Sequence, residues 1–211
     1  MMVMVPVNGN RWCKDMAVQH PGKIGFICGP SYWSSPPENI PYVLDNDAFN
    51  KRHNWDSEEW ILMLRKASKI HAPLWAAVPD VVGDFKGTLK KWGYYSSVIE
   101  GFGFKPKFVV QDGMENHIDL VPPNSHGVFV GGTTKFKWQT AAMWCKKFST
   151  HIGRVNCIGR VCVSETIGAE SCDGAGWMRV GNDRNQWGRG KHGLESFFNG
   201  WRDSQMEFAH Q

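Results

Sequence analysis

The hydrophobic positions of the chain fall into short runs, and polar turn residues follow each run. The runs are rich in β-forming residues and lack a clear alternation of polar and apolar side chains. This pattern is typical of strands that are covered on both faces. We expect strands at Met4–Val7, Lys23–Cys28, Tyr42–Asp45, Leu74–Pro79, Lys107–Gln111, Val128–Val130, Arg154–Asn156 and, more weakly, Cys172–Asp173.

Between several of these runs the apolar positions change to a helical spacing. In Ser57–Ile70 we expect Ser57 as the N-cap, with two glutamates in the first turn and basic residues near the end. Further helices are expected at Lys86–Glu100, Lys135–Phe148 and Cys157–Glu170. Strands that alternate with helices predict a parallel sheet.

Eight parallel strands with intervening helices fit a compact (β/α)8 TIM-like barrel, although 211 residues lie at the short end for that fold. The competing architecture is an open, doubly wound sheet. That fold usually carries GxGxxG or GxxxxGK[ST] after its first strand, and the sequence has neither motif there. We therefore expect one barrel domain over residues 1–211, with a basic, Trp-rich segment at about 177–211.

Composition narrows the class of protein. Hydrophobic residues make up 42% and charged residues 21%, which excludes a disordered chain. The apolar runs are too short to span a membrane and we see no secretory signal, so we expect a cytoplasmic protein. A net charge of +4 permits a polyanionic partner without requiring one.

The six cysteines include no CxxC pair, which argues against a zinc finger or ribbon. We expect core thiols and no metal; the less favoured alternative is a site built from His151, Cys157, Cys162 and Cys172.

Candidate chemistry lies where the expected strands end, because barrel enzymes place their catalytic groups at the carboxyl ends of strands. Taken singly, an Asp, Asn or Gly after a strand is an ordinary turn or cap residue. Together these positions predict a pocket of carboxylates and amides. They are Asp45, Asp80, Gln111, Gly131, Gly132, Asn156 and Asp173.

Six short motifs, in the same order, resemble the tRNA-guanine transglycosylase superfamily. Leu44-Asp45-Asn46-Asp47-Ala48-Phe49 is similar to the family's LDSGGF segment, and Asp80 after Val78-Pro79 is similar to its base-binding aspartate. Val110-Gln111-Asp112-Gly113 is similar to its VQGG motif, and Val130-Gly131-Gly132 is similar to its GGL turn. His151-Ile152-Gly153-Arg154-Val155-Asn156 is similar to its strand ending in GVG, and Asp173 before Gly174 is similar to its nucleophile. The resemblance covers about residues 24 to 180.

The departures from that family are informative. Its zinc motif, CxCxxC followed by a histidine, does not follow Asp173, and the chain is much shorter than the tRNA enzymes. Asn46-Asp47-Ala48 replaces Ser-Gly-Gly, and Asp173 begins an Asp-Gly-x-x-Trp segment that ends at Trp177. These features look like the DNA-modifying branch, the DpdA-type guanine transglycosylases of phages and genomic islands. The resemblance implies exchange of guanine in DNA for a free 7-deazaguanine base such as preQ0 or preQ1, by a monomer without a zinc cofactor.

The chemistry of base exchange suits these residues. Breaking an N-glycosidic bond needs a carboxylate beneath C1′ and a proton for the departing base. The resemblance makes Asp173 the nucleophile that forms a covalent glycosyl intermediate, and Asp45 the group that manages the proton. Asp80 can accept hydrogen bonds from guanine N1–H and N2–H₂, an arrangement that adenine cannot satisfy. Gln111 suits O6 or the substituent at position 7.

The remaining candidates complete the base pocket. Backbone N–H groups of Gly131 and Gly132 can reach O6 because no Cβ blocks them, and Asn156 is a further substrate-binding candidate. Asp47 is either a second pocket carboxylate or, as we slightly favour, a helix cap. Arg154 either pairs with a pocket carboxylate or touches a phosphate. Asp84 and Asp112 fit cap and turn positions.

The target base must be flipped out or already single-stranded, because an enzyme cannot reach it inside a stacked duplex. Arg179, Arg184, Arg189 and Lys191 lie among tryptophans near the C-terminus, which suits contact with phosphates and stacking on bases. Equally, this segment is a solvated tail whose tryptophans cover the barrel. Two other functions fit the residues: a hydrolytic N-glycosidase, and a barrel that binds nucleic acid without catalysis.

Overall fold

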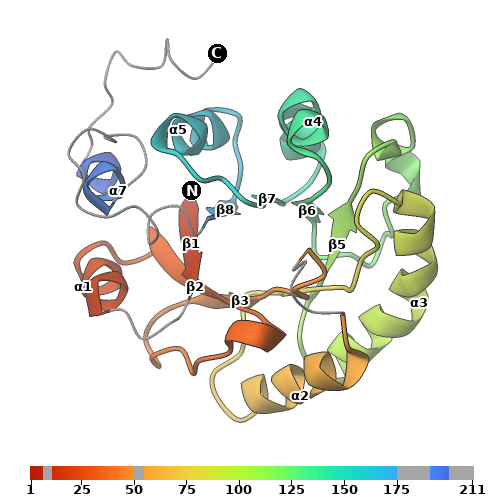
Figure 1. The fold of residues 1–211 in the computed structure, drawn as a ribbon, viewed down its shortest axis with the longest axis horizontal. Helices are drawn as coiled ribbons and strands as arrows, with labels where there is room; N and C mark the ends of the chain where they lie inside the picture. Colours follow the sequence, from red (N-terminus) through yellow and green to blue (C-terminus); the bar gives the residue numbers. More distant parts are fainter. Residues whose placement is uncertain (7–10, 50–54, 175–190, 200–211) are drawn as a thin grey trace.

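The computed structural model describes residues 1–6, 11–49, 55–174 and 191–199, and its centre is a closed barrel of eight parallel strands (Figure 1). Each strand pairs with the next, and β8 pairs with β1 through Val3 and Cys172. The expected (β/α)8 fold is confirmed. The strands are β1 (Met2–Pro6), β2 (Ile24–Cys28), β3 (Tyr42–Leu44), β4 (Ala76–Ala77), β5 (Pro106–Val110), β6 (Val128–Val130), β7 (Thr150–Ile152) and β8 (Ser171–Asp173).

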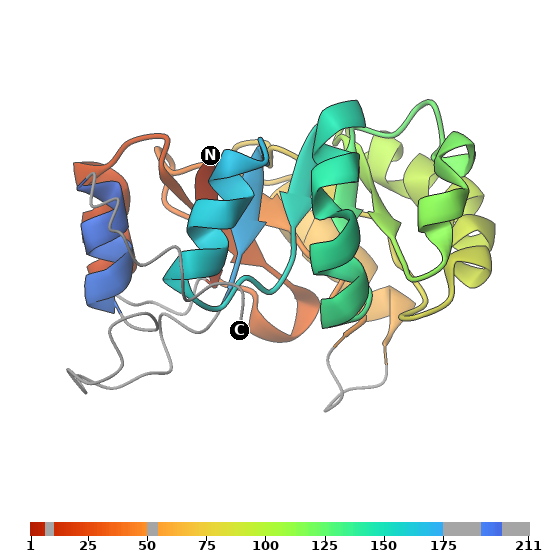
Figure 2. The same ribbon diagram turned by 90° about the horizontal axis from the view of Figure 1, so that it is seen from above.

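Helices surround the barrel on its outer side, as the two perpendicular views show (Figures 1 and 2). They are α1 (Arg11–Gln19), α2 (Ser57–Ala67), α3 (Phe85–Gly101), α4 (Thr134–Lys147), α5 (Ile158–Thr166) and α7 (Lys191–Phe198). Two crossovers contain short 3₁₀ turns in place of an α-helix. These turns are η1 (Pro30–Tyr32) between β2 and β3, and η2 (Met114–Asn116) with η3 (Ile118–Leu120) between β5 and β6.

Both faces of the strands are buried, which explains why the strand pattern does not alternate. Inside the barrel, Met4, Val43, Trp75 and their neighbours form a small core. A larger core lies between the strands and the helices, where Trp60 of α2 and Trp144 of α4 are fully buried. None of the helices in the described part of the chain has the length and apolar character needed to span a membrane.

The predicted seventh strand, Arg154–Asn156, is wrong. The strand is Thr150–Ile152, and Arg154 follows it in a left-handed turn with φ of 56°. The apolar Val155 suggested a strand, but its N–H binds the carbonyl oxygen of Asp173 beyond the edge of the regular sheet. Strand and turn are therefore displaced by four residues from their predicted positions.

Helix boundaries differ by smaller amounts. The N-cap of α2 is Asp56, not Ser57, because the Asp56 carboxylate accepts hydrogen bonds from the N–H groups of Glu58 and Glu59. Helix α5 ends at Thr166 rather than Glu170, and Gly168 follows with a φ of 84°. A left-handed glycine just after a helix is a common way to end it.

Helix α7 completes the ring of helices between α5 and α1 (Figure 1). Its Leu194 is fully buried, its Glu195 accepts a hydrogen bond from Trp12 of α1, and Phe198 packs against His20 with ring centroids 5.3 Å apart. Part of the C-terminal segment is therefore a barrel element. Arg179, Arg184 and Arg189 lie outside the described residues, and Lys191 is the first residue of α7; their contact with nucleic acid stays a prediction.

Candidate active site

The predicted acidic residues meet at the mouth of the barrel formed by the carboxyl ends of its strands. Asp45 directly follows β3, and Asp80 follows β4 after Val78-Pro79. Gln111 directly follows β5, and Asp173 is the last residue of β8. In a parallel barrel these ends share one face, so residues that are up to 128 positions apart in sequence lie around one opening.

Asp45 lies in an environment that favours its protonated form. Burial and the nearby negative charge of Asp173 raise the pKa of Asp45 to about 7, although the hydroxyl of Tyr32 donates a hydrogen bond to its Oδ2 over 2.9 Å. Burial and the charges of Asp45, Asp47 and Asp173 raise the pKa of Tyr32 well above 10, so that hydroxyl keeps its proton. Asp45 and Asp173 therefore share one site, with Tyr32 beside them.

Tyr32 was missed by sequence reasoning, since it belongs to η1 rather than to a strand end. The local sequence Gly29-Pro30-Ser31-Tyr32 makes this turn, and a Cβ on Gly29 would lie 2.5 Å from the Tyr32 ring. Only glycine leaves room for that ring. The shortened β2–β3 crossover thus brings a phenol to Asp45.

Asp80 is held from two sides and is only 7% exposed. Its Oδ1 accepts from Asn46 Nδ2 over 2.8 Å, and its Oδ2 accepts a short hydrogen bond from Gln111 Nε2. Gln111 Oε1 in turn accepts from the N–H of Gly83 over 3.0 Å. Burial raises the pKa of Asp80 to about 6, while the hydrogen bond from Asn46 and the positive charge of Lys91 oppose the shift. Gln111 therefore orients Asp80, and this side-chain contact is one that we did not predict.

Asp173 is held by two donors at one oxygen. His151 Nε2 lies 3.0 Å from Asp173 Oδ1, and the backbone N–H of Arg154 donates to the same oxygen over 3.1 Å. Below it, Ser171 Oγ lies 2.8 Å from His151 Nδ1. His151 is fully buried against the rings of Trp75 and Phe129, and this burial lowers its pKa. His151 is a second residue of the site that sequence reasoning did not assign to it.

Arg154 lies close to the acidic cluster. Its guanidinium stacks on Phe49, with the Cζ atom 3.7 Å from the ring centroid, and donates a hydrogen bond to the carbonyl oxygen of Gly132. Burial lowers the pKa of Arg154, and the negative charges of Asp173, Asp45 and Asp80 counter that shift. The Arg154 guanidinium therefore adds positive potential near the pocket carboxylates, while its own direct contacts are the Phe49 ring and the Gly132 carbonyl oxygen.

Lys137 is a third residue that sequence reasoning missed. It lies on α4 with 2% of its surface exposed, and its Nζ donates a hydrogen bond to the carbonyl oxygen of Gly153. Burial and the positive charge of Arg154 lower the pKa of Lys137 to about 7, whereas Asp173 opposes the shift. This contact supports the turn that presents the Arg154 N–H to Asp173.

The glycine pair differs from its predicted role. The N–H of Gly131 donates to the carbonyl oxygen of Val110 over 3.1 Å, so it is not available for guanine O6. Gly132 has φ of 65°, and a Cβ there would lie 2.4 Å from Asp112 Oδ2. The pair is needed for close packing of the loops after β5 and β6, where Asp112 also accepts from Thr133.

Other predicted residues have mixed outcomes. Asn156 does not follow a strand end directly, because β7 ends at Ile152. Its side chain is exposed and donates a hydrogen bond to the carbonyl oxygen of Arg154 over 3.3 Å. Asp47 has φ of 58°, accepts a hydrogen bond from Ser31 Oγ, and its negative charge raises the pKa of Asp45, as expected of a second pocket carboxylate. Its alternative role as a helix cap stays a prediction, because residues 50–54 lie outside the described part of the chain. Asp84 is confirmed as a cap, since it accepts from the N–H of Gly87 at the start of α3.

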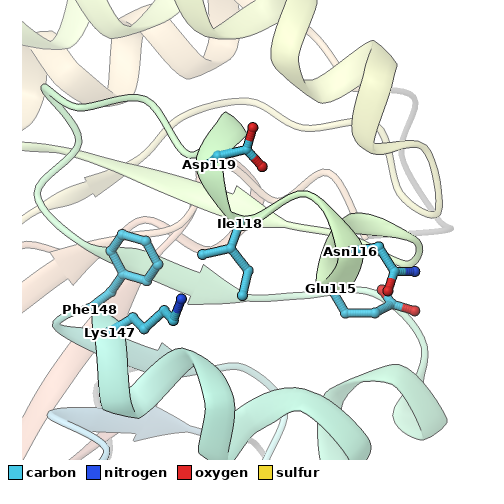
Figure 3. A pocket seen from close by; sticks show the side chains of 6 residues that line it. All are labelled: Glu115, Asn116, Ile118, Asp119, Lys147 and Phe148. Carbon is cyan, nitrogen blue, oxygen red and sulfur yellow. The ribbon is translucent and has the colours of Figure 1, made fainter.

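A groove with a volume of about 690 Å³ lies away from this cluster, on the outside of the barrel (Figure 3). Its wall consists of the turns η2 and η3 on one side and the end of α4 on the other. Ile118 and Phe148 point into it, and the charged groups around it are Glu115, Asp119 and Lys147. The groove exists because the β5–β6 crossover has no α-helix; none of the acidic residues of the mouth lines it.

The part of the chain that the structure describes contains no group of three or more His, Cys, Asp or Glu side chains arranged to hold a metal ion. Within the alternative metal set, His151 is engaged with Ser171 and Asp173 instead. Cys172 is fully buried, and burial raises the pKa of its thiol. Among the described residues, His151 and the cysteines therefore do not form the alternative metal site, and the expected lack of a metal stays a prediction.

Comparison with known proteins identifies the fold of this chain and gives no information about its activity. No family model and no curated protein matches the sequence. Among solved structures, 3-hexulose-6-phosphate synthase from Salmonella typhimurium aligns with a TM-score of 0.55 at 9% identity, over 88% of this chain and 94% of that one. The carboxyl transferase domain of Rhizobium etli pyruvate carboxylase with pyruvate aligns with a TM-score of 0.54 at 10% identity, over 86% of this chain and 41% of that one. At this identity the similarity shows the barrel fold alone.

Proposed function

We propose that this protein is a pentosyltransferase that exchanges guanine in DNA for a free 7-deazaguanine base. The observation that carries the proposal is the pair of interacting carboxyl groups at the mouth. The pKa of Asp45 is raised to about 7 beside Asp173, and Asp173 has one oxygen fixed by two donors. A glycosyl transfer that retains configuration needs such a pair: one group that exchanges a proton near neutral pH and one that attacks carbon.

The first half of the reaction releases guanine. A carboxylate oxygen of Asp173 attacks C1′ of the deoxyribose, the C1′–N9 bond breaks, and the Asp45 carboxyl gives its proton to the departing base. In the second half, N9 of the 7-deazaguanine attacks C1′, and the bond from C1′ to Asp173 breaks. The N9 proton returns to Asp45. Two displacements at the same carbon give net retention, and both carboxyl groups end in their starting state.

Recognition of guanine is assigned to Asp80. Each carboxylate oxygen can accept two hydrogen bonds, and in Asp80 one place on each is already taken by Asn46 and Gln111. The remaining places suit the adjacent N1–H and N2–H₂ donors of guanine and of 7-deazaguanines. Adenine presents an acceptor at N1 and would leave a buried carboxylate unpaired, which costs orders of magnitude in selectivity.

The test is incubation of guanine-containing DNA with isotope-labelled preQ0 or preQ1, followed by digestion to nucleosides. Label in a deoxynucleoside supports exchange. Free guanine with abasic sites indicates a hydrolytic glycosidase, and binding without either product indicates a non-catalytic barrel. Both single- and double-stranded DNA, with matched RNA, identify the nucleic acid.

Two aspartate variants make this test specific. Asp173→Asn removes the nucleophile and should abolish exchange. Asp84→Asn is the matched control, because Asp84 caps α3 outside the cluster and asparagine also caps helices. Near-normal exchange by Asp173→Asn would refute the proposed mechanism.

A further inference from the structure

His151 links the barrel interior to the acidic mouth through two hydrogen bonds in line. Ser171 and Asp173 lie two residues apart on β8, so both side chains point to the same side of that strand. His151, on the neighbouring β7, contacts both: Nδ1 lies 2.8 Å from Ser171 Oγ, and Nε2 lies 3.0 Å from Asp173 Oδ1. The order from the interior to the mouth is therefore serine, histidine, aspartate.

This order distinguishes the set from a serine hydrolase triad. Ser171 is 3% exposed and lies at the buried end, whereas the Asp173 side chain is 15% exposed and lies at the open end. A substrate at the mouth meets Asp173 and cannot reach Ser171. The serine hydroxyl is thus suited to orienting His151 rather than to attacking a substrate.

The surroundings of His151 favour its neutral form. The ring is enclosed by Trp75 and Phe129, with centroids 4.8 and 4.6 Å away, and burial lowers its pKa. Asp173 and Glu170 oppose that shift, and Lys107 adds to it. A neutral imidazole has one N–H, and an ionised Asp173 can only accept, so the proton belongs on Nε2 and Ser171 donates to Nδ1.

We infer that His151, fixed by Ser171 as the neutral Nε2–H tautomer, is a positioning residue that holds Oδ1 of Asp173 and leaves Oδ2 to act on the substrate. Oδ1 already accepts from His151 and from the Arg154 N–H, and within the described residues no donor is bonded to Oδ2. A neutral donor orients the carboxylate without cancelling its charge. An imidazolium would instead form an ion pair and weaken the nucleophile. The catalytic part of this inference rests on the proposed function; the tautomer does not.

Nuclear magnetic resonance of protein labelled with ¹⁵N-histidine tests the tautomer without any substrate. The chain has eight histidines, and the signal of His151 is the one that disappears in His151→Gln. We expect a neutral Nε2–H ring at pH 7 and at pH 8. An Nδ1–H tautomer, or an imidazolium at pH 7, would overturn the inference, whatever the exchange assay shows. The tautomer is read from the wild-type chain and the variant serves only to assign the signal; His151→Asn gives the same assignment if His151→Gln does not fold.

A second experiment measures the exchange activity of two variants, His151→Gln and His151→Leu. His151→Gln keeps an N–H that can reach Asp173, whereas His151→Leu removes the donor. We expect His151→Leu to lower kcat by about 100-fold, as misplacement of a reacting group does, and His151→Gln to recover part of that loss. KM for the 7-deazaguanine should stay unchanged, because Asp80 binds the base. Equal kcat in both variants and the wild type would show that His151 does not position Asp173. A loss confined to Asp173→Asn would leave the proposed function standing without this inference.

Discussion

Replacing Asp45 by asparagine should make the protein more stable near neutral pH while it stops exchange. The carboxyl group ionises in a place that disfavours its charge: its pKa rises from 3.8 to about 7 on folding because of burial and the charge of Asp173. Asparagine has nearly the same shape and can still accept the hydrogen bond from Tyr32. The substitution therefore removes the charge and little else.

The magnitude follows from the size of the pKa shift. Three pKa units correspond to about 4 kcal/mol, at about 1.4 kcal/mol per unit, and this is an upper bound because Asp45 is partly exposed. The sign is fixed by linkage. A folded-state pKa above the unfolded value means that the stabilisation by the protonated form is complete below pH 3.8 and is lost as the pH rises to about 7. The asparagine variant has no such loss.

Urea unfolding followed by tryptophan fluorescence measures this difference at pH 4.5 and pH 8. We expect the variant to gain stability relative to the wild type between these two values, by about 1 to 4 kcal/mol. Asp119→Asn is the control, since Asp119 is an exposed carboxylate in η3, away from the mouth. A stability difference that is the same at both pH values would refute the argument that Asp45 is a strained charge.

Substitutions at three further positions test local contributions to stability. Gly132→Ala should lower the free energy of unfolding by about 1–3 kcal/mol, because φ is 65° and the new methyl meets Asp112; a calorimetric melting temperature that does not fall would contradict this. Gly93→Ala, in the middle of α3 with open space around it, should raise the same quantity by about 0.5–1 kcal/mol, and a decrease would show a contact not seen here. Asp56→Ala should cost about 1 kcal/mol in urea unfolding, whereas Asp56→Asn should cost much less if the side chain acts as the cap of α2.

The sequence predicted the candidate site correctly where a site residue directly follows a strand. Short runs buried on both faces predicted most strands of the barrel, and the acidic residues that follow them predicted Asp45, Asp80 and Asp173 at one mouth. These predictions hold because the end of a parallel strand is a fixed place in a barrel, so that order in the sequence translates directly into position around the opening.

Sequence reasoning failed where the site uses residues outside the strand ends. His151 lies inside β7, and placing that strand at Arg154–Asn156 put the histidine in a loop. Tyr32 comes from a 3₁₀ turn, and Lys137 comes from a helix whose other buried residues are mainly apolar or small. The role of a buried polar side chain becomes evident only from the group to which it is hydrogen-bonded. For Tyr32, Lys137 and His151 these groups lie 13 to 22 residues away in the sequence, so local pattern does not reveal them.

The two crossovers that contain 3₁₀ turns in place of an α-helix differ in how well they should tolerate insertions. The β5–β6 connection replaces its helix with turns that border an open groove away from the acidic mouth, so added residues there should extend into solvent without disturbing the reaction. The β2–β3 connection also lacks an α-helix, but its turn carries Tyr32, whose hydroxyl contacts Asp45. Lengthening the β2–β3 loop would displace the Tyr32 hydroxyl from Asp45. A new segment should therefore be inserted in the β5–β6 connection and not in the β2–β3 connection.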